Sequence, residues 1–379
     1  MTRAGSVDLS ITIGELTLAN PILVASGTFG YGDEYAHVVD PRELGGVVTK
    51  TVTIKPRAGN PPTRIAETAA GMLNSIGLEN VGLQKFRAEK VPRLAALGAT
   101  IIASIGGDTA QHLERLLAAL ADESAIAGFE VNFSCPNVAK GGARYWTVPR
   151  RLTATMLRLR AITKKPLIAK LSPDVTAISE LARACEAGGA DALTATNTFV
   201  GMAIDLSTGR SKLNRATGGL SGPAVKPLAL ARCYECVQAV RIPVIGSGGI
   251  VTGRDALEFL AVGAAAVQVG TSSFLRPRAS VDILAEMRSI LARTGAESIA
   301  AWREELIARA GEPSHGLGPS LVQRAGVGVR SDGTVAGNDS RDSNGARVAE
   351  SEPAIDGAHD RVLEHHHAGL SANLKGEHS

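Results

Sequence analysis

The amino-acid sequence predicts an α/β fold, a (β/α)8 barrel with a disordered C-terminal tail. Three observations favour this fold: short β-branched runs alternate with longer Ala/Leu/Glu/Arg stretches, the runs number eight, and polar residues follow them. Alternating strands and helices are typical of βαβ units with a parallel sheet. Such a barrel uses about 250 residues as one domain, so a chain of 379 residues does not require a second domain. An open doubly wound sheet is the alternative fold.

Each of the runs is largely apolar and short, as expected for parallel strands that are buried on both faces. In a TIM barrel such strands follow one another around a closed sheet, and a helix follows each strand. The predicted strands, in chain order, are Pro21–Val24, Val47–Lys50, Ile101–Ser104, Gly128–Phe133, Pro166–Leu171, Asp191–Thr196, Pro243–Ser247 and Ala264–Gly270.

Helices are predicted between the strands, for example over His112–Ala121, Ile178–Ala187 and Asp255–Ala261. A further helix is predicted around Ile299–Arg309, which carries Trp302 and Leu306. Before it, an amphipathic helix is indicated by apolar residues at helical spacing, namely Ile283, Leu284, Met287, Ile290 and Leu291.

The composition changes after Gly311. Residues 313–379 contain no Phe, Tyr, Trp, Cys or Met, and Gly, Ser, Asn, Asp and Arg dominate. Such a segment does not bury enough apolar surface to offset the entropy lost on ordering. We therefore expect a barrel domain over residues 1–312 and a disordered polar tail over residues 313–379.

Composition and charge argue against several classes of partner. Aromatic residues make up 3% of the chain, too few for a base-stacking surface, and the net charge of +3 is not concentrated in any basic run. The sequence has no apolar stretch of the length of a membrane span and no signal-peptide pattern at its start. Its four cysteines do not form a dense disulfide framework. We expect a cytoplasmic protein that binds neither nucleic acid nor membrane.

Polar residues gather where the predicted strands end, which is where barrel proteins bind their ligands. Because nearly every strand contributes, the pattern predicts a site. The strand-end residues are Ser26-Gly27-Thr28, Lys50-Thr51, Ser104, Asn132-Phe133-Ser134-Cys135-Pro136-Asn137, Lys170, Thr196-Asn197-Thr198, Gly246-Ser247-Gly248-Gly249 and Gly270-Thr271.

The glycine-rich ends of the last two strands indicate a phosphate site. Gly248, Gly249 and Gly270 allow backbone N–H groups to approach an anion, and helices begin just beyond them. Ordinary tight turns are the alternative. Lys50 and Lys170 lie in or at the end of apolar strands, where an unpaired amine is costly. They are interpreted as fixed cations facing a ligand, against the alternative of snorkelling or core ion pairs.

Cys135 is a candidate nucleophile or proton acceptor, because it follows a strand and its thiolate is reactive; a structural buried cysteine is the alternative. Asn74, Asn132 and Asn197 carry amides suited to a cyclic imide or a carboxylate. No metal site is expected. The pair Cys233 and Cys236 is better explained by one face of a helix than by zinc or redox chemistry, and the run His365-His366-His367 by the polar tail.

The sequence resembles the dihydroorotate dehydrogenase family over roughly residues 8–310, with the motifs in the family's order. They are Thr28-Phe-Gly-Tyr-Gly-Asp-Glu-Tyr35, Asn74-Ser-Ile-Gly-Leu78, Asn132-Phe-Ser-Cys-Pro-Asn137, Asn197-Thr198, Gly218-Gly-Leu-Ser-Gly-Pro223 and Gly246-Ser-Gly-Gly249. Cys135 resembles class 1, since class 2 has a serine there. Cys135-Pro-Asn-Val-Ala-Lys-Gly-Gly142 and Gly219-Leu-Ser-Gly-Pro-Ala224 are more similar to subclass 1B than to 1A.

The resemblance implies an FMN-containing barrel that oxidises (S)-dihydroorotate to orotate in de novo pyrimidine synthesis. It implies that Cys135 removes the C5 proton, that a hydride passes from C6 to N5 of FMN, and that Lys50 lies between flavin and substrate. The ammonium of Lys170 is suited to stabilise the negative charge on the N1/O2 side of reduced flavin. Subclass 1B further implies an electron-transfer subunit carrying FAD and a [2Fe–2S] cluster that reduces NAD⁺, within a heterotetramer built on a homodimer of the barrel.

The resemblance also implies which residues contact the ligands. The catalytic residues are Cys135 and Lys50. The substrate-binding residues are Lys50, Asn74, Ser75, Ile76, Gly77, Leu78, Asn132, Asn197 and Thr198. The FMN-binding residues are Ser26, Lys50, Thr51, Ser104, Asn132, Lys170, Thr196, Gly222, Gly248, Gly249, Gly270 and Thr271.

The chain departs from the family pattern in two places. Ser104 stands where the family usually has an asparagine that contacts FMN, which predicts a shorter or water-mediated contact or an altered flavin affinity. The tail extends beyond the family's usual end. Four alternative functions are a related FMN barrel that acts on another dihydropyrimidine such as dihydrouracil, a class 1A-like enzyme that uses fumarate without a partner, a flavin-binding electron relay, and a phosphate-binding barrel isomerase.

Overall fold

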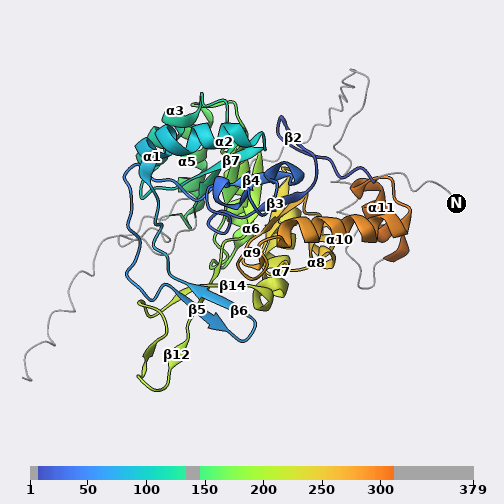
Figure 1. Ribbon diagram of the computed structural model, residues 1–379. Coiled ribbons are helices and arrows are strands. Elements are labelled where there is room, and N and C mark those ends of the chain that lie inside the picture. The colour runs from blue at the N-terminus through green and yellow to red at the C-terminus, as the bar shows by residue number, and fades with distance from the viewer. Residues whose placement is uncertain (1–6, 134–145, 311–379) are drawn as a thin grey trace, which may run out of the picture. The chain divides into compact units, whose positions relative to one another are not determined.

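Eight parallel strands close into a barrel in the computed structural model, which describes residues 7–133 and 146–310 (Figure 1). This confirms the predicted fold class. The strands are paired in the order β10-β15-β16-β3-β4-β7-β8-β9, and β9 pairs with β10 to complete the ring. Every strand predicted above is present, with ends that differ by a few residues. The barrel strands are β3 (Ile22–Val24), β4 (Gly46–Val48), β7 (Ile101–Ile105), β8 (Gly128–Asn132), β9 (Leu167–Lys170), β10 (Ala192–Ala195), β15 (Val244–Ser247) and β16 (Ala266–Val269).

Helices follow the strands and cover the outside of the barrel (Figure 1). The predicted helices are confirmed, and α10 buries Ile283, Leu284, Met287 and Leu291 as their spacing indicates. The longer helices are α2 (Val91–Leu97), α3 (Ala110–Leu120), α5 (Pro149–Arg160), α6 (Ile178–Ala187), α7 (Lys226–Ala239), α8 (Gly253–Ala261), α10 (Ala279–Thr294) and α11 (Ile299–Ala310). Shorter turns are η1 (Asp33–Tyr35), η2 (Pro41–Glu43), α1 (Gly82–Lys85), the π-helical η3 (Phe86–Lys90), η4 (Pro223–Val225) and α9 (Ser272–Leu275).

The interior of the barrel is apolar near the amino ends of its strands. A hairpin of β1 (Ile11–Ile13) and β2 (Leu16–Leu18) closes that end, and Ile13 and Leu18 are completely buried against it. Because these two side chains fill the end of the barrel, ligands reach its interior from the opposite end. The apolar cluster that they contact consists of Leu23, Val48, Ile102, Ile168, Ala192, Ile245 and Ala266.

A second sheet, which the sequence analysis did not predict, is formed by segments that follow two of the barrel strands. Its antiparallel order is β11-β14-β6-β5, and a small β12–β13 hairpin extends from β11; β5, β6, β12 and β14 gather on one side in Figure 1. The bounds are β5 (Ile65–Thr68), β6 (Gly71–Asn74), β11 (Phe199–Gly201), β12 (Ile204–Asp205), β13 (Arg210–Ser211) and β14 (Gly218–Ser221). These strands are two to four residues long and mostly half-buried or exposed, so they lack the continuous apolar runs of the barrel.

The predicted disordered tail, residues 313–379, lies outside the described residues, as does Cys135. Within residues 7–133 and 146–310, no helix combines the length and the apolar character needed to cross a bilayer.

The closing hairpin generates a prediction about stability. Leu18→Ala removes a side chain with no exposed surface from the closed end of the barrel. We expect the free energy of unfolding to fall by about 2–5 kcal/mol, because the cavity left behind does not collapse fully. Urea denaturation followed by far-UV circular dichroism measures the change. Thr17→Ala, at an exposed position of the same strand, is the control and should change the free energy by no more than about 0.5 kcal/mol. Equal losses in the two variants would contradict this account.

Candidate functional site

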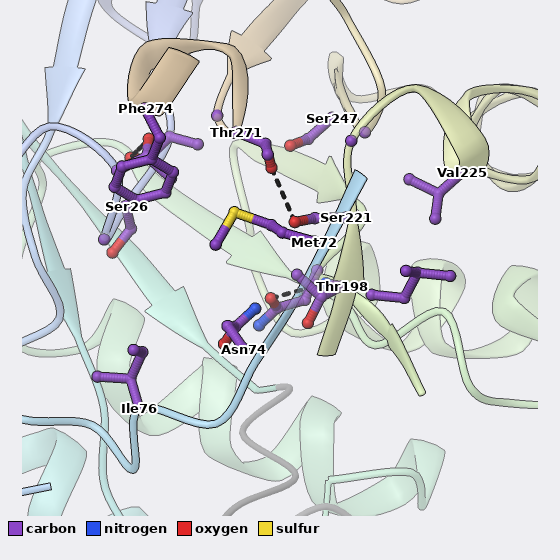
Figure 2. A pocket seen from close by; sticks show the side chains of 18 of the residues that line it. Ser26, Met72, Asn74, Ile76, Thr198, Ser221, Val225, Ser247, Thr271 and Phe274 are labelled. Atoms are coloured by element: carbon purple, nitrogen blue, oxygen red, sulfur yellow. Dashed lines mark hydrogen bonds between the residues drawn. The ribbon is translucent and has the colours of Figure 1, made fainter. Parts of the chain in front are cut away.

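A cavity of about 380 Å³ lies where the barrel strands end, and the antiparallel sheet contributes to its wall (Figure 2). This volume is in the range of small-molecule sites, about 300–1,000 Å³. Side chains reach it from both structures: Asn74 and Met72 come from β6, and Thr271 and Phe274 follow β16 (Figure 2).

The structure brings together most of the residues for which a ligand contact was predicted. Those that line the cavity are Ser26, Lys50, Thr51, Asn74, Ile76, Gly77, Leu78, Asn132, Lys170, Thr196, Asn197, Thr198, Gly222, Gly248, Gly249, Gly270 and Thr271. They come from the ends of seven barrel strands, all except β7, and from β6 and the segments that follow β6 and β14, so the cavity is complete only when the barrel is closed.

Three predicted site residues are not among those that line the cavity. Ser75 is completely buried behind it, where its hydroxyl accepts a hydrogen bond from the Nδ2 atom of Asn60 at 2.9 Å. Ser104 is also completely buried, and its hydroxyl bonds the Thr51 hydroxyl at 2.9 Å. Thr51 in turn bonds Ser26 at 3.2 Å, so Ser104 reaches the cavity only through Thr51. Cys135 lies outside the described residues.

The glycine-rich loops after β15 and β16 carry backbone donors that the protein leaves unused. Among the described residues, the N–H groups of Gly248, Gly249 and Thr271 have no hydrogen-bond acceptor. Gly249 has a φ of +73°, and a Cβ atom there would lie 2.6 Å from the backbone nitrogen of Lys226. The loop therefore requires glycine. Unused N–H groups at a cavity wall suit an anion such as a phosphate group.

Lys170 lies at the carboxyl end of β9 with 6% of its surface exposed, and its side chain lines the cavity. Its ammonium donates a hydrogen bond to the Oε1 atom of Gln268 at 3.0 Å. The Oε1 atom of Glu130 is 3.6 Å away. A cation held by buried partners is a fixed source of positive charge, which suits a ligand that gains negative charge.

Lys50 is a second cation in the cavity, and it is held differently. Its ammonium makes no hydrogen bond or ion pair with another residue in the described part of the chain. Burial lowers the pKa of Lys50; the nearby carboxylate of Glu79 opposes that change, and Arg64 adds to it. An amine that is costly to bury and lacks a protein partner is suited to pair with an anionic ligand.

Amide side chains complete the polar surface of the cavity. The Nδ2 atom of Asn74 donates to the carbonyl oxygen of Gly219 at 3.1 Å, which ties β6 to β14. The Nδ2 atom of Asn132 lies 3.4 Å from the Thr51 hydroxyl, and the Oδ1 atom of Asn197 accepts from the N–H of Thr198 at 2.8 Å. These contacts fix the orientation of the amides, which suits recognition of a planar polar ring.

The apolar wall and several hydroxyls of the cavity were not predicted from the sequence. Met72 and Leu220 belong to the second sheet, which was not predicted. The hydroxyl of Ser221 accepts from that of Thr271 at 2.8 Å, as Figure 2 shows. Ser221 lies within the motif Gly218-Gly-Leu-Ser-Gly-Pro223, which was the signal available for it. The remaining residues without a predicted contact are Ala25, Gly27, Thr28, Ile65, Glu79, Val225, Ser247, Ile250, Ser272 and Phe274.

Cys233 and Cys236 lie on helix α7, as predicted. Both thiols are free and buried, and burial raises the pKa of Cys233 and raises that of Cys236 to about 12. Buried, protonated thiols of this kind are structural.

Comparisons with known proteins give consistent matches. The family model described as dihydroorotate dehydrogenase matches residues 8–291. The protein named "Dihydroorotate dehydrogenase B (NAD(+)), catalytic subunit" of Trichlorobacter lovleyi is 50% identical over 291 residues, which are 77% of this chain and 96% of that protein. The protein of the same name from Geobacter metallireducens is 49% identical over 288 residues, 76% of this chain and 94% of the relative.

A solved structure agrees with these matches. The dihydroorotate dehydrogenase of Eimeria tenella, crystallised in complex with ferulenol, aligns with a TM-score of 0.64 and 25% sequence identity. The alignment covers 78% of this chain and 87% of that chain.

The buried and unpartnered ammonium of Lys50 generates a prediction about how stability depends on pH. Lys50→Met removes the cost of burying an unpartnered ammonium, so we expect the ligand-free protein to gain about 0.5–2 kcal/mol in free energy of unfolding at pH 7. The folded chain loses this proton at a lower pH than the unfolded chain, because the pKa of Lys50 is below its ordinary value of 10.5. The gain should therefore shrink as the pH rises toward 10.5.

Urea denaturation at pH 7 and pH 9.5 measures this difference. Lys55→Met is the matched control, because Lys55 is exposed five residues further along the chain and should leave the free energy unchanged at both pH values. A Lys50→Met variant that is less stable than the wild type at pH 7 would show that the ammonium has a favourable partner.

Proposed function

The chain belongs to the dihydroorotate dehydrogenase family, and on this premise we propose that it is the catalytic subunit of a class 1B enzyme that oxidises (S)-dihydroorotate to orotate in pyrimidine synthesis. The observation that carries the proposal is the cavity at the barrel mouth. Two lysines, three asparagines and a set of unused backbone donors converge there. Cations and amides together suit a ring that bears both an imide and a carboxylate.

We infer that the resident cofactor is FMN. The unused N–H groups of Gly248, Gly249 and Thr271 suit its phosphate, and Lys170 suits the part of the flavin ring that becomes negative on reduction. The hydroxyls of Ser26 and Thr51 provide further polar contacts. When bound, FMN supplies the hydride acceptor for carbon C6 of the substrate.

The chain's own residues would bind the substrate and move its proton. We propose that Asn74, Asn132, Asn197 and Thr198 hold the ring and the carboxylate, with Lys50 opposite the negative charge. Cys135 would take the proton from C5 through its Sγ atom. This assignment rests on its place in the motif Asn132-Phe-Ser-Cys-Pro-Asn137, directly after strand β8.

We further propose that electrons leave through a partner subunit that carries FAD and a [2Fe–2S] cluster and reduces NAD⁺. The names of the relatives support this, since they include both "catalytic subunit" and "NAD(+)". The proposed assembly is a heterotetramer built on a homodimer of the barrel.

Anaerobic stopped-flow spectroscopy tests the substrate, the flavin and the electron acceptor together. The purified protein should be yellow, and dihydroorotate should bleach its flavin band whereas dihydrouracil should not. Fumarate, NAD⁺ and a quinone are then added separately as oxidants. Rapid reoxidation by fumarate would support a class 1A-like enzyme, and a bound flavin that dihydroorotate does not bleach would support an electron relay. A colourless protein would favour a barrel isomerase.

Cys135→Ser tests the proton acceptor. A serine hydroxyl is a far weaker base than a thiolate, so we expect anaerobic flavin reduction by dihydroorotate at neutral pH to slow by about 10²–10⁴-fold. The controls are the FMN content of the variant and its reduction by dithionite, both of which should match the wild type. An unchanged rate with dihydroorotate would remove Cys135 from the mechanism.

Gly249→Ala tests the phosphate cradle. The new Cβ atom would lie 2.6 Å from Lys226 in a loop whose φ is +73°, so the loop and its N–H groups must shift. We expect the dissociation constant of FMN to rise at least tenfold in a fluorescence titration of the apoprotein. Gly209→Ala is the matched control, because its φ is +66° and no atom lies within 4 Å of the added Cβ. Equal affinities in the two variants would place the phosphate elsewhere.

A further inference from the structure

A buried acid lies below the cavity and does not line it. Glu130, on strand β8, has no exposed surface. Its Oε2 atom accepts hydrogen bonds from the Thr194 hydroxyl at 2.9 Å and from the Nε2 atom of Gln268. Its Oε1 atom has no hydrogen-bond partner and faces the ammonium of Lys170 at 3.6 Å. The mechanism proposed above gives Glu130 and Gln268 no role.

Gln268 stands between these two charges in only one orientation. A carboxylate only accepts hydrogen bonds and an ammonium only donates them. The Nε2 end of Gln268 therefore faces Glu130, and its Oε1 end takes the hydrogen bond from Lys170 at 3.0 Å. If the amide were flipped, its Oε1 atom would face the carboxylate and its Nε2 atom would face the ammonium, so both contacts would be repulsive.

The result is an ion pair that is longer than two more exposed lysine pairs of the protein. Lys226 and Asp255 are 2.7 Å apart, and Lys90 and Glu34 are 2.6 Å apart, although these pairs are more exposed than that of Lys170 and Glu130. In a buried setting the attraction between opposite charges is stronger than at the surface. The Oε1 atom of Gln268 lies 3.0 Å from the ammonium of Lys170 and competes with Glu130 for it.

We propose that Gln268 is a positioning residue that holds the ammonium of Lys170 toward the cavity and away from full pairing with Glu130. Glu130 supplies the counter-charge that makes a buried lysine tolerable, and Gln268 keeps the positive charge available to the ligand. The inference rests on the proposed binding of FMN. On that basis, Gln268 raises the affinity of the site for reduced flavin relative to oxidised flavin.

The test measures the midpoint potential of the bound flavin by dye equilibration under anaerobic conditions. Gln268→Met keeps the size of the side chain and removes the acceptor, so Lys170 should move to Glu130. We expect the preference for reduced flavin to fall about tenfold, which is about 30 mV for a two-electron couple.

Two double variants separate positioning from a structural role. In a Lys170→Met background, Gln268→Met should cause no further shift, because Gln268 carries no charge of its own. In a Glu130→Gln background the ammonium has no carboxylate to approach, so the potential should not fall below that of Glu130→Gln alone. If Gln268 only stabilised the fold, the shift caused by Gln268→Met would be the same in every background, and that result would overturn the proposal.

Single variants keep the proposal testable if Gln268→Met does not retain flavin. Glu130→Gln removes the charge that competes for Lys170, so its midpoint potential should rise; an unchanged or lower potential would overturn the inference. Urea denaturation of each apoprotein reports loss of folding separately. A wild-type protein that binds no FMN would instead refute the proposed function.

Discussion

Closure of the barrel determines which side chains face one another inside it. Alternate residues of each strand point inward, so residues two apart on one strand lie at successive heights in the barrel. Ala192 and Ala266 belong to the apolar cluster that the β1–β2 hairpin closes. Two residues further along the same strands, Thr194 and Gln268 bond Glu130. The same geometry that buries the apolar cluster therefore forces the next inward positions to satisfy their polar groups among themselves.

This arrangement explains why the site has two cations of different character. Lys170 emerges from within the barrel and has buried partners, whereas Lys50 follows β4 and has none in the described part of the chain. A lysine that the protein neutralises keeps its position whether or not a ligand is present. A lysine without a protein partner obtains its counter-charge from the ligand. Until a ligand binds, the buried and unpaired ammonium lowers the stability of the folded protein. The cavity thus contains one lysine whose charge is balanced by the protein and another whose charge is balanced only when an anionic ligand binds.

Most of the barrel could be predicted because its strands are continuous apolar runs, and strand-end residues such as Asn132 and Thr196 necessarily converge on the same mouth. The second sheet could not be predicted, because strands such as β5 and β14 are short and partly exposed, and β14 pairs with β6, which is distant in sequence. Glu130 lies inside a run that was correctly predicted as a strand. Its role could not be predicted, because its hydrogen-bond partners come from strands more than sixty residues away.

The cavity is assembled from the beginning and the end of the barrel, since Ala25 follows its first strand and Phe274 its last. The residues that line the cavity are therefore spread over nearly the whole length of the barrel. A ligand that occupies the cavity consequently binds only the closed ring, and mass action shifts the folding equilibrium by RT ln(1 + [L]/Kd). A ligand that binds in the cavity would therefore also stabilise the pairing between the first and the last strands of the barrel, β3 and β16.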